Sequence, residues 1–115
     1  MSTIKANTWQ NTSGLENFPC TAWVNFDGNS ITIRDSGNVS SVVENATGDF
    51  TINFTNAMSN INYAIVATRA TNTTSKTTTG PKYDGATTTS CRIYSLHDGV
   101  LNGANVVSVV IHGGR

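Results

Sequence analysis

The segment that decides the fold reads VSSVVENATGDFTINFT, residues 39–55. Two runs of strand-forming residues flank the connection 45–48, which ends in glycine, and this is the pattern of a β-hairpin. In the second run apolar residues alternate with polar ones, and the apolar set is Phe50, Ile52 and Phe54. Side chains alternate between the two faces of a strand, so this period of two predicts one buried face and one hydrated face.

The same pattern of short runs separated by Gly and Asn turns extends along the chain. Seven strands are expected, at residues 22–26, 30–34, 39–44, 49–55, 62–69, 88–96 and 105–112. No window has the period of a helix. Seven short strands at intervals of roughly ten residues predict an all-β protein, either an antiparallel β-sandwich or a jelly roll.

The 115 residues are expected to form one domain with two further features. Residues 1–19 are polar with sparse apolar positions, which predicts an extended N-terminal arm for docking or assembly, or else a frayed terminus. The β-sandwich domain is expected over residues 20–115. It contains a Thr-rich segment, 70–87, whose length predicts a functional or disordered loop. The assembly anchors expected in the arm are Ile4, Trp9 and Leu15.

Composition excludes several classes of partner. Only 12% of residues are charged, and seven basic residues balance seven acidic ones. Nucleic-acid binding needs a basic face, so no nucleic acid is expected. No apolar run approaches the length of a membrane span, and no membrane insertion is expected. The chain instead contains 18 Thr, 14 Asn and 11 Ser, which predicts a neutral surface rich in hydrogen-bonding groups.

Catalytic and metal signatures are weak. The neighbours His97 and Asp98 have poor geometry for a base and its orienting group. A nucleophilic pair of Cys20 with His97 is conceivable only because such partners can be distant in sequence. His112 could hold a metal on a threefold axis, but no ligand spacing supports one. No catalytic residue, metal or cofactor is therefore expected. Cys20 and Cys91 are expected to be buried, reduced thiols rather than a disulfide.

Aromatic and charged side chains suggest a binding surface. Tyr83 in the long loop and Tyr94 on a strand could stack on a carbohydrate, whereas Trp23 and Phe26 sit on a regular strand and are expected in the core. Basic residues surround the same loop and could meet anionic sugars. The receptor-contact candidates are Arg69, Lys76, Lys82, Tyr83 and Asp84.

Several segments in order resemble a known class of viral proteins. They are residues 4–7, 10–14, Cys20, 22–28, 33–42, 47–58 and 62–64. This part of the chain resembles tail-fibre end domains and small virion structural proteins of tailed bacteriophages, particularly phages of cyanobacteria. The resemblance implies a trimeric β-structure on a virus particle and supplies no catalytic residues. It fades after Arg69, where a receptor-facing surface would vary.

The expected function is that of a virion structural protein of a tailed phage. The first hypothesis is a tail-fibre or tail-tip component that binds the host surface, with the arm attaching it and residues 70–87 facing the receptor. The alternatives are a capsid cement or decoration protein and a freestanding carbohydrate-binding module. The expected partners are copies of itself in a trimer, other virion proteins and a host cell-surface glycan. The expected location is the virion, on the tail or capsid surface, after synthesis in the host cytoplasm.

Overall fold

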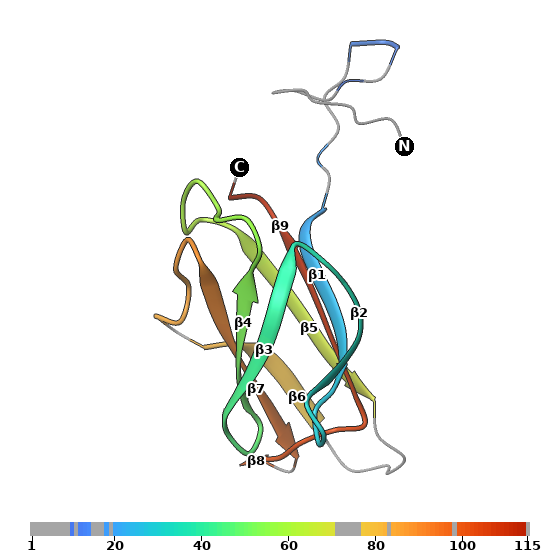
Figure 1. The fold of residues 1–115 in the computed structure, drawn as a ribbon, viewed down its shortest axis with the longest axis vertical. Helices are drawn as coiled ribbons and strands as arrows, with labels where there is room; N and C mark the ends of the chain where they lie inside the picture. The colour runs from blue at the N-terminus through green and yellow to red at the C-terminus, as the bar shows by residue number, and fades with distance from the viewer. Residues whose placement is uncertain are drawn as a thin grey trace.

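The computed structural model describes residues 10, 12–14, 18, 20–70, 77–82, 84–97 and 99–114. These residues form nine strands and no helix (Figure 1). The strands are β1 (Cys20–Asp27), β2 (Thr32–Gly37), β3 (Val39–Ala46), β4 (Asp49–Phe54), β5 (Ala64–Ala70), β6 (Thr77–Pro81), β7 (Ser90–His97), β8 (Val100–Leu101) and β9 (Val106–His112). The prediction of an all-β protein is confirmed.

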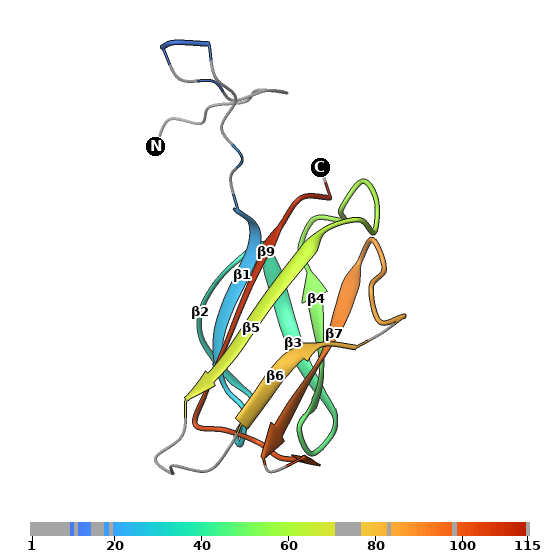
Figure 2. The same cartoon turned by 180° about the vertical axis from the view of Figure 1, so that it is seen from behind.

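Two antiparallel sheets pack face to face. The four-stranded sheet has the order β2-β1-β9-β5, and the five-stranded sheet has the order β3-β4-β7-β6 with β8 also paired to β7. The edge strands β5 and β6 lie side by side, as Figure 2 shows, so the two layers meet along that edge. The sandwich, one of the two predicted architectures, is the one observed.

Two of the nine strands were not predicted. The seven expected strands are present with their ends shifted by a few residues, but β6 lies inside the segment 70–87, which was predicted to be a loop. Thr77 to Pro81 pair with His97 to Ile93 of β7, so this part of the prediction is wrong. The segment was predicted to be a loop because its threonines, although common in strands, show no alternation of apolar and polar residues. The other unpredicted strand, β8, has only two residues.

The core lies between the sheets and is centred on two phenylalanines. Phe26 of β1 and Phe50 of β4 are both 0% exposed, and their rings meet edge to face with centroids 5.1 Å apart. Near the end where β4 finishes, Phe54 packs against Tyr63 in the same manner. The Tyr63 hydroxyl shares its proton between the backbone carbonyls of Thr87 and Ser90 at the start of β7, at 2.7 and 3.0 Å. Burial raises the pKa of Tyr63 to about 12.

A single residue carries the chain from one sheet to the other. Asn38, between β2 and β3, has φ of 55°, in the left-handed region that asparagine tolerates better than most residues. Its amide nitrogen donates to the carbonyl of Thr21 at 3.0 Å and to that of Asn56 at 3.2 Å. Its amide oxygen accepts the backbone N–H of Asn56 at 2.7 Å. The Asn38 side chain therefore joins β1 to the segment that follows β4.

Loss of the Asn38 side chain is expected to destabilise the sandwich. Asn38→Ala removes three hydrogen bonds and should lower the free energy of unfolding by about 3 kcal/mol. Asn38→Gly removes the same bonds but tolerates positive φ, so it should cost about 1 kcal/mol less than alanine. Urea denaturation measures both. Asn102→Ala, at an exposed position, is the control and should change stability by less than about 0.5 kcal/mol. An equal loss of unfolding free energy in Asn38→Ala and Asn38→Gly would show that the positive φ at this position causes no strain in alanine.

Candidate functional site

Strand β1 presents an aromatic ring to solvent. Ala22, Val24 and Phe26 point into the core and are 1%, 2% and 0% exposed, whereas Trp23 is 39% exposed. The prediction that Trp23 belongs to the core is wrong. The signal was available, because Phe26 and Trp23 are three residues apart and side chains an odd number of residues apart lie on opposite faces of a regular strand.

Trp23 belongs to a row that crosses the whole four-stranded sheet. Its partner on β2 is Gly37, its partner on β9 is Val110, and Val110 in turn pairs with Val66 of β5. Val110 and Val66 are 37% and 60% exposed. The indole lies over Gly37, where an added Cβ would overlap Nε1 and lie 2.8 Å from Cδ1 of the ring. We call these four residues the Trp23 row.

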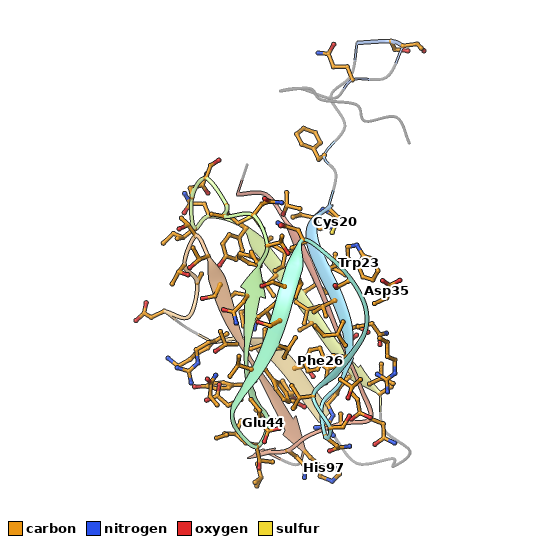
Figure 3. The ribbon with its side chains drawn as sticks, viewed as in Figure 1. Cys20, Trp23, Phe26, Asp35, Glu44 and His97 are labelled. Atoms are coloured by element: carbon orange, nitrogen blue, oxygen red, sulfur yellow. The ribbon has the colours of Figure 1, made fainter. Side chains whose placement is uncertain are left out.

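A polar row runs parallel to the Trp23 row, two residues further along the strands. It consists of Asp35, Asn25, Ser108 and Thr68, again one residue from each strand. Asn25 donates from Nδ2 to Ser108 Oγ at 3.4 Å. One carboxylate oxygen of Asp35 accepts the N–H of Ser36 at 2.9 Å. Figure 3 shows the Trp23 and Asp35 side chains pointing away from the sandwich on the same side.

The charges near these two rows are few. Arg34 donates to the carbonyl of Asn105 at 2.7 Å and to Oδ1 of Asn25 at 3.3 Å, and it lies 3.6 Å from the Asp27 carboxylate. Backbone N–H groups of Asn29 and Ser30, together with Arg34, lower the pKa of Asp27. Asp35 has no cationic partner among the described residues. The outer face of this sheet is therefore close to neutral, with one uncompensated carboxylate.

The predicted receptor contacts are not assembled into one described surface. Arg69 lies on β5 and donates to the carbonyls of Leu96 and Gly103, both at 3.1 Å, and burial lowers its pKa. This arginine ties the two layers together. Lys82 and Asp84 share a turn before β7, in which the N–H of Gly85 donates to the carbonyl of Lys82 at 3.0 Å. The remaining candidates lie outside the described residues: Lys76, Tyr83, Ile4, Trp9 and Leu15.

Tyr94 lies on the outer face of the other sheet. It pairs with Asp49 on one side and Gly80 on the other, and its side chain is half-buried. The adjacent Arg92 donates from Nε and Nη2 to the two carboxylate oxygens of Asp49, at 3.3 and 2.5 Å. This ion pair already satisfies both charges, so the face around Tyr94 offers less to a ligand than the Trp23 row does.

The conceivable Cys20 and His97 pair is not formed. Figure 3 shows Cys20 and His97 at opposite ends of the sandwich, so they cannot act as nucleophile and base. The Cys20 thiol donates instead to the carbonyls of Ala22 and Ile111, at 3.0 and 3.3 Å. Within the described ranges, no group of three or more His, Cys, Asp or Glu residues could hold a metal. The same part of the chain has no helix long and apolar enough to cross a membrane.

Comparison with known proteins leaves the function to be argued from this geometry. No family model, no curated protein and no solved structure matches the chain. The outer face of the four-stranded sheet is the candidate site, because it combines an exposed aromatic ring with a row of hydrogen-bonding groups, one of which is the Asp35 carboxylate.

Both cysteines are free thiols, as predicted, but only one of them is buried. Cys91 is 0% exposed, whereas Cys20 is exposed, so the prediction of two buried thiols is wrong for Cys20. The difference follows from position, since Cys20 begins β1 at the end of the sheet and Cys91 lies in the middle of the core. Burial raises the pKa of the Cys91 thiol from 9.0 to about 12.

The buried thiol predicts a pH dependence of stability. Between pH 9 and pH 12 the unfolded chain loses the Cys91 proton while the folded chain keeps it, so stability is lost as pH rises through this window. The free energy of unfolding should fall by about 1.4 kcal/mol per pH unit from this group, and Tyr63 adds the same sign above pH 10. Urea denaturation from pH 7 to 11 measures it. Cys91→Ala should flatten the slope between pH 9 and 10, and Cys20→Ala should not.

Gly37 is expected to control the position of the Trp23 ring. Gly37→Ala places a methyl group where the indole lies and should move the ring outward, towards water. In a Trp9→Phe background, where Trp23 is the only tryptophan, its fluorescence emission should shift to longer wavelength and become more accessible to acrylamide. Gly80→Ala, which meets no atom within 4 Å, is the matched control. An unchanged spectrum in Gly37→Ala would show that the ring does not lie over Gly37.

Proposed function

We propose that this chain is a virion structural protein of a tailed phage, a tail-fibre or tail-tip component that binds the host surface. The single observation that carries the binding role is the exposed Trp23 ring beside a polar row on the outer face of the four-stranded sheet. The virion role rests on the resemblance of residues 4–69 to phage tail-fibre and virion proteins.

The arrangement of exposed apolar side chains on this sheet supports a binding role. Isolated exposed apolar side chains are ordinary, but the Trp23 row aligns three of them across adjacent strands. An aromatic ring held by sheet pairing loses little further conformational entropy when it binds. The face is therefore organised before a partner arrives.

In this role the chain forms a homo-oligomer, a trimer, that is attached to other virion proteins through the N-terminal arm. One weak contact per chain is then multiplied, because the second and third contacts form within an assembly already held at the surface. Low net charge on the chain agrees with close association of copies. The trimer keeps the Trp23 faces available to the host.

Labelling of intact particles tests the proposed function. Gold-conjugated antibody against this chain should decorate the tail or its fibres in electron micrographs. Purified protein added before infection should slow adsorption several-fold by occupying the receptor. Label spread over the head would overturn the tail assignment in favour of a capsid decoration protein. The absence of label on particles would overturn the virion role altogether.

A further inference from the structure

We propose that the Trp23 face is the receptor-contact surface and that its ligand is a neutral saccharide, with one sugar ring stacked on Trp23 and its hydroxyl groups bonded by Asp35 and Ser108. This inference rests on the proposed function and names the site and ligand class within it. The proposed receptor contact thus lies in the middle of a sheet, whereas the sequence pattern predicted it in residues 70–87.

The size of the apolar area favours a small ligand over a second copy of the chain. At 39% exposure Trp23 offers about 100 Å², and the two valines together add a similar amount, so the Trp23 row exposes about 200 Å² of apolar side chain. A stable protein interface buries about 800 Å² on each partner. The row by itself supplies about a quarter of that area, whereas it matches one face of a sugar ring.

The two parallel rows match the two chemical surfaces of a sugar. A pyranose ring has an apolar face of C–H groups and a rim of hydroxyl groups. Trp23 presents a ring for the C–H face, and its Nε1–H makes no hydrogen bond with the described residues. Asp35 lies two residues along β2 from Gly37, which places its carboxylate about 7 Å along the strand, at the edge of a ring stacked on Trp23.

The hydrogen-bonding capacity of the polar row is only partly used. One carboxylate oxygen of Asp35 accepts the N–H of Ser36, and the other oxygen has no hydrogen-bond partner among the described residues. A carboxylate can accept from two adjacent hydroxyl groups, and such charge-assisted bonds are stronger than neutral ones. Ser108 accepts from Asn25 and retains its own proton for a ligand. Thr68 is exposed at the far end of the row.

The charges of the face favour a neutral saccharide over an anionic one. Arg34 is the only cation on the described outer face of this sheet, and it is held by Asn105, Asn25 and Asp27. Asp35 would repel a sialic or uronic acid placed on the indole. Arg69, the other arginine of this sheet, donates to the carbonyl of Leu96 in the opposite sheet and to that of Gly103 in the connection before β9. Anionic lipid surfaces are disfavoured for the same reason.

Titration of the purified full chain with named sugars tests the inference. The probes are maltotriose, lactose and triacetylchitotriose as neutral saccharides, with sialyllactose as the anionic comparison. In the Trp9→Phe background, at least one neutral probe should change Trp23 fluorescence with a dissociation constant in the millimolar range. Trp23→Thr, a strand-forming replacement, should weaken binding at least tenfold when measured by saturation-transfer NMR. Asp35→Asn should weaken it several-fold.

Matched variants separate the site from a general loss of structure. Val43→Thr removes an exposed apolar side chain from the other sheet and should leave the affinity within twofold of the parent chain. If Trp23→Thr fails to fold, Gly37→Ala displaces the same ring and should also weaken binding. No neutral saccharide bound at tens of millimolar, or binding unchanged when Trp23 is replaced, would overturn the inference. Tighter binding of sialyllactose, or a dimer lost in Trp23→Thr, would overturn it as well.

The failures of the two proposals are distinguishable. Gold label on the tail together with no sugar binding would retain the proposed function and reject the Trp23 site. Sugar binding that depends on Trp23, together with label on the head or on no part of the particle, would retain the site and reject the tail-fibre role.

Discussion

The constraint on which the structure depends is the register of β1 between β2 and β9. Phe26 of β1 meets Phe50 of the opposite sheet at the centre of the core, and the same strand places Trp23 outside, between Gly37 and Val110. A slip of one residue would exchange these two faces, burying Asn25 and exposing Phe26. Core formation therefore specifies the outer face at the same time, and the position of the aromatic ring needs no separate device.

Polar groups then fix how the two sheets lie against each other. Apolar packing between sheets is not directional, whereas hydrogen bonds to backbone carbonyls are directional. Asn38 joins β1 to the end of β4, and Arg69 joins β5 to the segments around Leu96 and Gly103. These contacts link the two layers at different strands, at β1 through Asn38 and at β5 through Arg69.

Much of the fold could be predicted from local patterns, and the candidate site could not. Alternation in residues such as Phe50, Ile52 and Phe54 predicts the strand and its buried face without knowledge of partners. The spacing between Trp23 and Phe26 indicates that Trp23 points outward, but its neighbours Gly37 and Val110 come from other strands and are known only from the structure. The partners of Arg69 could not be predicted for a similar reason, because the carbonyls of Leu96 and Gly103 lie far from it in sequence. Strand β6 could not be predicted because its threonines show no alternation of apolar and polar residues.

A binding site on a sheet face differs in its energetics from one on a loop. A flexible loop must lose backbone freedom when it binds, at a cost of about 1 kcal/mol or more for each residue ordered. Trp23 is already held by pairing on both sides of β1 and by contact with Gly37. A weak ligand such as a single sugar ring cannot offset a large ordering cost, but it can bind a ring that is ordered in advance. In the proposed trimer, repetition of that ring would raise the strength of attachment without new contacts in any one chain.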